Sequence, residues 1–346
     1  MQSRPLVAAA AATVTLGLLA VPAMADDFYK GRTVTLMVPS SLGASMGLYG
    51  RLIASALEKH IPGHPTVILQ SRPGAGGMTG TSYAYNAGPK DGSFIAMISA
   101  GNVLMPVLRD GVKYDVTRMQ WLGTIAVRPS ALWVWHTAPV KTIDEVKTKQ
   151  VILGSDGGGS NMTAWPLLVN AVLGTKFKII EGYKGGEEVN HAAEQGETQG
   201  RWTSYSGLTA AKTQWLEKGT VRLLLQFGPK IAEQKNVPSI HELVKGENLK
   251  LVRFMELSEH VGLGLWVRPE VPKDRVAVLR KALMDATHDP VLAAEAAKRR
   301  APFEPLSGAE IQQAIAEAYS LTPAEIDRLK SIIGIKKGAA AGKKKS

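Results

Sequence analysis

The sequence predicts an α/β fold with two lobes, and three observations support this prediction. Strand-like apolar runs alternate with helical runs along most of the chain, which is typical of open α/β sheets. Turns of small residues stand repeatedly where a strand-like run ends and a helical run begins. The chain has 346 residues, which is more than one compact core usually holds.

Residues 1–25 have the features of a signal peptide rather than of a folded element. Arg4 supplies a positive start, residues 6–21 are apolar, and Ala23 and Ala25 are the small residues that a signal peptidase recognises. The apolar run is shorter than the roughly 20 residues that cross a bilayer, which argues against a membrane anchor. We expect cleavage after Ala25 and export of the mature protein.

Composition excludes several classes of function. The chain has no cysteine, so it has no disulfide, thiol nucleophile or thiolate metal site. Its formal net charge is +11, but much of the excess lies in the Lys-rich segment 336–346, which we interpret as a solvated, disordered basic tail. Because no stripe of alternating aromatic and basic residues occurs, we expect no nucleic acid partner.

The elements follow one another as strand and helix through both halves of the chain. Leu48, Leu52, Ile53 and Leu57 illustrate the helical spacing of the apolar residues. Aliphatic and β-branched runs predict strands at 34–38, 66–70, 94–99, 120–127, 132–136, 151–154, 178–183, 200–205, 221–227 and 260–267. Helical spacing predicts helices at 45–60, 78–87, 142–148, 161–173, 186–195, 209–217, 272–287, 290–299 and 308–318.

The chain is expected to pass between the lobes twice. It leaves the first lobe around 126–139 and returns around 253–269, so the first lobe would comprise residues 26–127 and 255–335. The second lobe would comprise residues 128–254. Two such connections form a hinge beneath a cleft between the lobes.

Five loops of small residues follow strands and precede helices: Ser40 to Ser45, Arg72 to Gly77, Ser99 to Asn102, Gly154 to Asn161 and Tyr183 to Gly186. A helix start presents unpaired backbone N–H groups and the positive end of the helix dipole, which favour a carboxylate or phosphate. In open α/β sheets these loops gather at the carboxyl ends of the strands. We therefore predict an anion-binding cleft, although glycines in any single loop could simply allow a tight turn.

Catalytic and metal-binding motifs are absent from the sequence. Residues 154–157 lack the Gly-x-Ser-x-Gly spacing of a nucleophile elbow, and residues 72–77 lack the Gly-Lys-Ser/Thr ending of a phosphate loop. His60 and His64 are separated by Pro62 and Gly63, which makes a shared helix face for a metal improbable. We assign His191 to a solvated polar face and expect no cofactor and no metal.

Several strings of residues resemble those of the tricarboxylate-type extracytoplasmic solute receptors, also called the Bug family. Arg72-Pro73-Gly74-Ala75-Gly76-Gly77 is the most specific of these strings. Further matches are Arg32 to Pro39, Arg51 to Ala54, Pro89 to Gly92, Tyr114-Asp115, Gly154-Ser155, Tyr183 to Gly186, Val237 to Ser239 and Pro269 to Pro272.

The resemblance implies a periplasmic binding protein of the Venus-flytrap type that closes around a small organic carboxylate for a tripartite tricarboxylate transporter. It would work as a monomer with membrane subunits as partners. The alternatives are a carboxylate sensor that passes occupancy to a signalling partner, or a secreted serine hydrolase that uses Ser155 or Ser160.

The resemblance also implies which residues contact the ligand. In the first lobe these are Ser40, Ser41, Leu42, Gly43, Ala44, Ser45, Met46, Gly74, Ala75, Ser99, Ala100, Gly101 and Asn102. In the second lobe they are Asp156, Gly157, Gly158, Ser160, Asn161, Tyr183, Lys184, Gly185, Ser204 and Tyr205.

One position departs from the family pattern. Gly47 stands where the family commonly has an aspartate, which would suit a ligand amine or hydroxyl. Its absence favours a carboxylate with an apolar or aromatic body, which Met46, Tyr49 and Tyr205 could contact. Asp156 could supply a replacement acceptor or could repel a second carboxylate.

Overall fold

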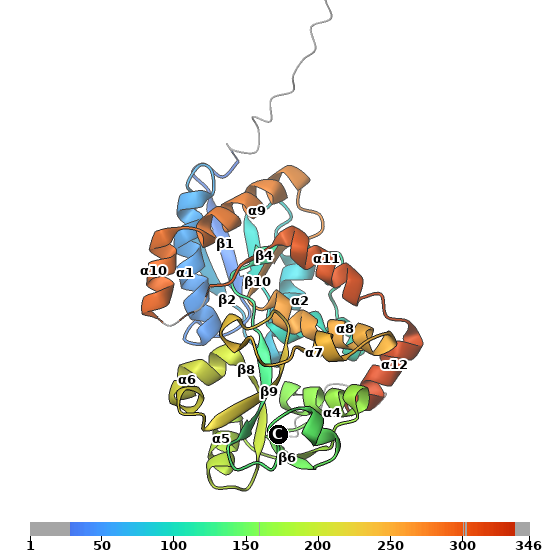
Figure 1. Cartoon of the computed structure of the whole chain (residues 1–346). Coiled ribbons are helices and arrows are strands. Elements are labelled where there is room, and N and C mark those ends of the chain that lie inside the picture. The colour runs from blue at the N-terminus through green and yellow to red at the C-terminus, as the bar shows by residue number, and fades with distance from the viewer. Residues whose placement is uncertain (1–27, 159, 300, 302, 336–346) are drawn as a thin grey trace, which may run out of the picture.

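The structure is a computed structural model that describes residues 28–158, 160–299, 301 and 303–335. The expected signal peptide and basic tail lie outside the described residues. Figure 1 shows two lobes, one above the other, and each has helices packed on a sheet. The predicted two-lobed α/β fold is therefore confirmed.

The first lobe is built on a sheet with the strand order β11-β4-β10-β3-β1-β2. Strands β1, β2 and β3 are parallel, whereas β10 runs antiparallel to both β3 and β4, and β11 runs antiparallel to β4. The strand bounds are β1 Thr33–Val38, β2 Thr66–Ser71, β3 Phe94–Met97, β4 Gln120–Thr124, β10 Gly264–Val267 and β11 Leu306–Ser307.

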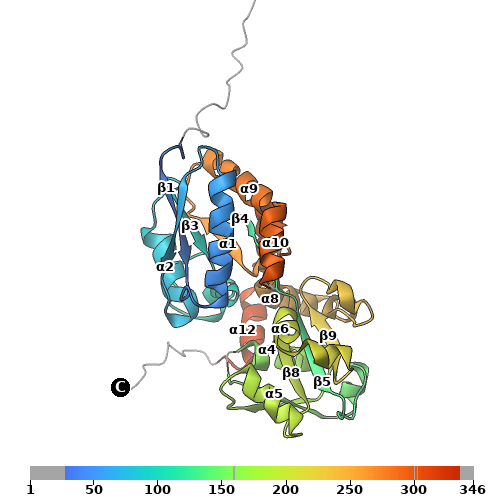
Figure 2. The ribbon, with the colours of Figure 1, turned by 90° about the vertical axis from the view of Figure 1, so that its left-hand side faces the viewer.

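Helices cover both faces of this first sheet (Figures 1 and 2). One face packs on α1 (Ser45–His60), α9 (Lys273–Thr287) and α10 (Pro290–Lys298) in a buried apolar cluster. The other face packs on α2 Met78–Ala87, α3 Met105–Leu108, α11 Gly308–Ala318 and the short 3₁₀ helix η2 Ala100–Val103. The parallel strands thus have helices on both sides, as parallel sheets require.

The second lobe is built on a sheet with the strand order β7-β6-β8-β5-β9. Its side chains alternate between two apolar clusters, because successive residues of a strand point to opposite faces. In β5, Leu132 and Val134 join the cluster that contains α4, whereas Ala131 and Trp133 join the cluster that contains α5 and α6. The bounds are β5 Ser130–Trp135, β6 Val151–Ser155, β7 Phe177–Glu181, β8 Gly200–Ser204, β9 Val221–Phe227, α4 Asn161–Leu173, α5 Gly186–Glu194 and α6 Tyr205–Glu217.

The chain passes between the sheets through two different connections. The first is the short segment from Thr124 to Ser130 that joins β4 to β5. The second contains α7 (Ile240–Leu243) and α8 (Glu247–Val261), which leads into β10. The sequence analysis predicted no helix over 247–261 and began a strand at 260, and both predictions were wrong. Helix α8 is buried on several sides, so its apolar residues do not form a simple amphipathic stripe.

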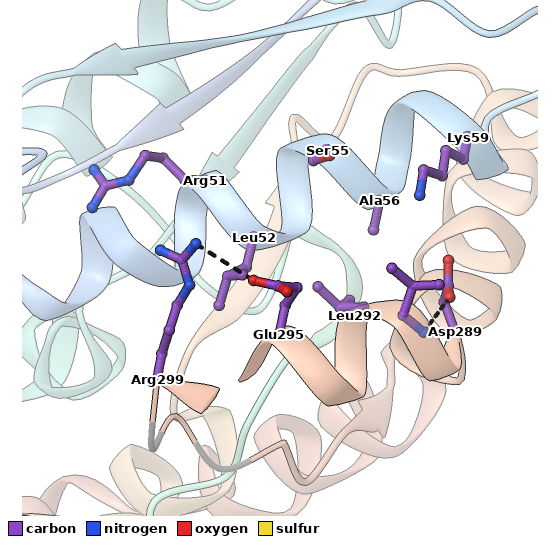
Figure 3. Close-up of a pocket in the computed structure, with 10 residues that line it drawn as sticks. Arg51, Leu52, Ser55, Ala56, Lys59, Asp289, Leu292, Glu295 and Arg299 are labelled. Atoms are coloured by element: carbon purple, nitrogen blue, oxygen red, sulfur yellow. Dashed lines mark hydrogen bonds and ion pairs between the residues drawn. The ribbon is translucent and has the colours of Figure 1, made fainter. Parts of the chain in front are cut away.

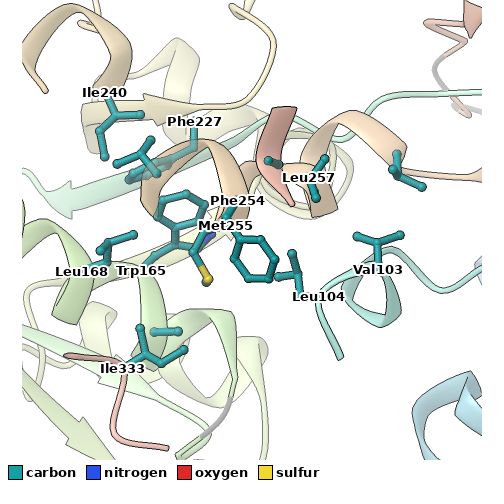
Figure 4. Close-up of a cluster of buried hydrophobic side chains, with 14 of the residues drawn as sticks. Val103, Leu104, Trp165, Leu168, Phe227, Ile240, Phe254, Met255, Leu257 and Ile333 are labelled. Carbon is teal, nitrogen blue, oxygen red and sulfur yellow. The ribbon is translucent and has the colours of Figure 1, made fainter. Parts of the chain in front are cut away.

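A single apolar cluster continues from one lobe into the other through α8 (Figure 4). Phe254 and Leu257 of α8 belong to it, together with Val103 and Leu104 from the first lobe and Trp165 from the second. Helix α12 (Pro323–Ile332) also contacts elements of both lobes, because it packs against α3 and α4. The exact lobe boundaries given above remain predictions.

Most other predicted elements are present. The helices at 45–60, 78–87, 161–173 and 308–318 and the strand at 221–227 have the predicted bounds, and the remaining strands shift by a few residues at their ends. Trp133 is fully buried, whereas Trp135 is only partly buried. Within the described ranges, no helix is long and apolar enough to cross a membrane.

Candidate functional site

The loops that follow β1, β2 and β3 lie together at one edge of the first sheet. These three strands are parallel neighbours, so their carboxyl ends share that edge. The Ser71 hydroxyl donates to the Ser40 carbonyl at 2.8 Å, and the Asn102 side-chain amide donates to the Gly76 carbonyl at 3.2 Å. The structure therefore brings together the three first-lobe loops that the sequence analysis singled out.

The predicted ligand contacts on these loops differ in their exposure. Asn102 is buried and its amide already holds Gly76, so its side chain braces the loops rather than facing an open cleft. The exposed members are Ser41, Gly43, Ala44, Ser45, Gly74 and Ala75. The half-buried members are Ser40, Leu42, Met46, Ser99, Ala100 and Gly101.

The first loop is packed tightly against the first turn of α1. A Cβ atom on Gly47 would lie 2.2 Å from the Leu42 carbonyl oxygen, so only a glycine permits this contact. The same carbonyl accepts a hydrogen bond of 2.7 Å from Nη1 of Arg51, one turn further along α1. The space that a side chain at position 47 would occupy is thus filled by the loop backbone itself.

Helix starts at this edge lack side-chain caps. The residues before α1 and η2, Ala44 and Ser99, accept no hydrogen bond with their side chains. Ser160 before α4 and Gly185 before α5 likewise provide no side-chain cap in the second lobe. The first backbone N–H groups of each helix have no partner within it, so they remain available to an anionic ligand.

The second-lobe loops follow β6, β7 and β8 and are held by internal hydrogen bonds. The hydroxyls of Ser155 and Thr163 lie 2.6 Å apart, and the Gly157 N–H donates to the Ser155 hydroxyl at 3.2 Å. Ser155 is 0% exposed, so its hydroxyl shapes the loop and cannot reach a substrate as a nucleophile. The Glu188 carboxylate accepts from the backbone N–H of Lys184 and holds the next loop.

The predicted second-lobe contacts are mostly accessible. Asp156, Gly158 and Lys184 are exposed. Gly157, Ser160, Asn161, Tyr183, Gly185, Ser204 and Tyr205 are half-buried. Because β6 is parallel to both β7 and β8, these loops share one edge of the second sheet.

A cavity of about 340 Å³ lies beside the first connection between the lobes. It is lined by Val127, Pro129, Tyr205, Glu233 and Glu304 among others. Burial and then the charge of Glu233 raise the pKa of Glu304. Two carboxyl groups make this cavity unfavourable for an anion, so we place the anionic part of a ligand at the loops.

A second cavity, of about 270 Å³, lies between α1 and α10 (Figure 3). Four of its charged side chains are engaged with other side chains or with the backbone. Glu295 pairs with Arg299 at 3.5 Å, Asp289 lies 3.2 Å from His60, and Arg51 donates to Leu42. This cavity has no uncapped loop of the kind described above, so we do not assign the site to it.

Sequence analysis missed one charged residue at the second-lobe edge. Arg201 in β8 is buried beside the loops that precede α4 and α5. A single arginine inside a strand pattern gave no signal, because arginine usually faces solvent. Within the described part of the chain, no group of three or more His, Asp or Glu residues is arranged to hold a metal ion.

Comparison with known proteins gives consistent matches. A family model described as "Tripartite tricarboxylate transporter family receptor" matches residues 50–332. A UPF0065 protein encoded in the gbd 5' region of Cupriavidus necator is 30% identical over 262 residues, which cover 70% of this chain and 75% of that protein.

Two solved structures show the same fold. A TctC solute-binding protein from Polaromonas without ligand has a TM-score of 0.68 and 20% identity, over 88% of this chain and 99% of that chain. Rpa4515 of R. palustris with adipate has a TM-score of 0.56 and 20% identity, over 88% of this chain and 97% of that chain.

Proposed function

The chain belongs to the tripartite tricarboxylate transporter receptor family, and we propose that it is a periplasmic receptor that captures a small organic carboxylate for such a transporter. Family membership excludes an enzymatic role as the primary function. The observation that carries the choice of ligand is the set of uncapped helix starts at the loop-bearing edge of each sheet.

Backbone N–H groups at these helix starts suit a carboxylate. A carboxylate accepts several hydrogen bonds at once, and the positive end of each helix dipole stabilises its negative charge. Glycine and serine make up much of the first loop, so little side-chain bulk separates a ligand from the backbone. The structural neighbour Rpa4515 with adipate supports the same ligand class.

We infer that binding occurs by closure of the two lobes. A carboxylate that contacts loops of both lobes has a higher affinity for the closed form and therefore shifts the population toward it. The closed protein, which we expect to be a monomer cleaved after Ala25, would then present one composite surface to the membrane subunits.

A thermal-shift screen tests the ligand class. The panel contains monocarboxylates, dicarboxylates, tricarboxylates, aromatic acids and amino acids. A ligand at 100 times its dissociation constant stabilises the native state by about 2.7 kcal/mol. We expect one class of acid to raise the melting temperature, and absence of any shift across the panel would contradict carboxylate binding.

A variant pair then tests the location of the site. Ser41 is exposed on the first loop, so Ser41→Leu should abolish ligand binding without harming the fold. Ser331→Leu, at an exposed position of α12, serves as the control and should bind as the native protein does. Unchanged affinity in a folded Ser41→Leu variant would remove this loop from the site.

Uptake measurements test the transport role separately. Cells that carry the receptor gene and genes for the two membrane subunits should accumulate the labelled acid, and cells without the receptor should not. Binding of the acid by the purified protein without any receptor-dependent uptake would contradict transport.

A further inference from the structure

Arg201 is a buried cation at the edge of the second sheet where α4 and α5 begin. Its residue is 7% exposed, and its pairing with Trp133 places it on the face of the sheet that packs against α5. Nε donates to the side-chain oxygen of Asn190 at 2.8 Å, and Nη1 donates to the Trp202 carbonyl at 3.2 Å. These bonds hold the guanidinium in one orientation.

The guanidinium lies between the first turns of two helices. Nη1 is 3.6 Å from the sulfur of Met162, in the first turn of α4. A Cβ atom on Gly186, the first residue of α5, would lie 2.8 Å from Nη1 and 2.9 Å from Nη2. Arg201 is therefore in contact with the starts of both helices that follow the predicted second-lobe ligand loops.

This arrangement places like charges together. Helix starts carry a partial positive charge. Helix α4 has neither a side-chain cap nor an acidic residue in its first turn, whereas Glu187 and Glu188 lie in the first turn of α5. A guanidinium buried beside the start of α4 is unfavourable unless an anion is also present. Arg201 adds its positive charge to that of the helix start, so this part of the lobe favours a negatively charged ligand group more strongly than the helix start alone would.

No carboxylate of the described residues fills this place. Arg201 forms no ion pair with any of them, and its Nη2 has no hydrogen-bond partner there. Asp156 and Glu187 act on it only at longer range, and both are exposed to water. Burial accordingly lowers the pKa of Arg201 to about 10.

We propose that Arg201 binds a second carboxylate of the ligand, so that the receptor selects dicarboxylates over monocarboxylates. This inference rests on the proposed function, in which the first carboxylate is bound by the first-lobe loops. A guanidinium presents two parallel N–H groups that match a carboxylate, and Nη2 is free to take part. A dicarboxylate then bridges the two lobes, which couples recognition of its second charge to closure.

Isothermal titration of the mature protein with matched pairs of acids tests this proposal. The pairs are butyrate and succinate, hexanoate and adipate, octanoate and suberate, and benzoate and terephthalate. In the native protein, at least one dicarboxylate should bind about tenfold or more tightly than its monocarboxylate partner. Equal affinity within every pair would overturn the inference while leaving the proposed function intact.

The variant Arg201→Gln separates recognition from a structural role. It should weaken binding of the preferred dicarboxylate by tenfold or more and leave its monocarboxylate partner unchanged. The control is Arg222→Gln, which removes an arginine of β9 that bonds the Val140 carbonyl in the same lobe, and it should alter neither acid. A parallel loss for both acids, or no loss for the dicarboxylate, would contradict ligand contact by Arg201.

The experiment distinguishes failure of this inference from a folding defect and from failure of the proposed function. The preference of the native protein is measured without any substitution, so a variant that fails to fold does not block the experiment. Binding of no acid in the panel would overturn the proposed function and this inference together, whereas binding without a preference overturns this inference alone.

Discussion

The indole N–H of Trp165 in α4 donates a hydrogen bond of 3.1 Å to Oε1 of Glu259 in α8. The same oxygen accepts the hydroxyl of Ser130 at 3.0 Å, at the start of β5, and Oε2 accepts the hydroxyl of Ser258 at 2.6 Å. One buried carboxyl group thus joins the helix that returns to the first lobe, the strand that enters the second lobe, and a helix of the second lobe.

The buried carboxyl group of Glu259 should make the stability of the protein depend on pH. Burial raises the pKa of Glu259 to about 7 from an ordinary value of 4.5, so the folded protein retains a proton that the unfolded chain releases. Stability therefore falls as the pH rises through this window, by roughly 3 kcal/mol for the full shift. The change in unfolding denaturant concentration between pH 5 and pH 7 should be clearly smaller for Glu259→Gln than for the native protein. A variant as pH-dependent as the native protein would contradict this role.

A second titrating group, His241, is paired with Glu256 in α8, the same helix that contains Glu259. Nε2 of His241 pairs with Oε2 of the buried Glu256, and this hydrogen bond raises the pKa of His241 against the effect of its own burial. The pair stabilises the fold fully below the ordinary pKa and loses its contribution as the pH rises through the raised pKa. NMR titration should give a midpoint above 6.5 for His241, and Glu256→Gln should lower it. An unchanged midpoint in that variant would argue against the pair.

The close contact between Gly47 and Leu42 should fix the conformation of the loop from Ser40 to Ser45. Gly47→Ala would place a methyl group against the Leu42 carbonyl, so the loop must move. We expect the affinity for the preferred acid to fall about tenfold or more, because the loop backbone is displaced. Ser55→Ala, at an exposed position further along α1, is the control and should bind as the native protein does. Equal affinities of the two variants would show that the contact between the loop and Gly47 does not shape the site.

Leu329 should hold α12 against the apolar cluster that contains α8. This side chain is fully buried in the cluster that α8 shares between the lobes. Leu329→Ala should reduce the free energy of unfolding by about 2 to 5 kcal/mol, because it removes buried methyl groups and leaves a cavity. Ile326→Ala, at a half-buried position of the same helix, should cost clearly less in denaturant unfolding. A smaller loss for Leu329 than for Ile326 would contradict this packing.

The sequence was sufficient to predict elements whose pattern has a single period. Helix α4 and strand β9 matched because their apolar residues follow the spacing of a helix and a strand beside obvious turns. The grouping of the first-lobe loops also followed from sequence, since consecutive strand-to-helix turns meet at one edge of a parallel sheet. Tertiary contacts only refined the ends of these elements.

Helix α8 shows where this reasoning stops. Its buried residues include Glu256 and Glu259 as well as Phe254 and Leu257, so charged and apolar residues share the interior. A sequence pattern assigns glutamate to the surface because burial of a charge is costly. Only hydrogen-bond donors contributed by distant segments, such as Gly228 and Ser130, make these positions acceptable.

The sequence by itself determined the α/β class, the strand-to-helix loops and the resemblance that carries the function, because these depend on local periodicity and on short strings of residues. Only the tertiary structure decided that α8 and α12 connect the lobes, that Gly47 is covered by the Leu42 carbonyl, and that Arg201 is buried without an ionic partner among the described residues. The physical reason is that burial and charge compensation depend on atoms from segments far apart in the chain, and no local pattern records which of them meet.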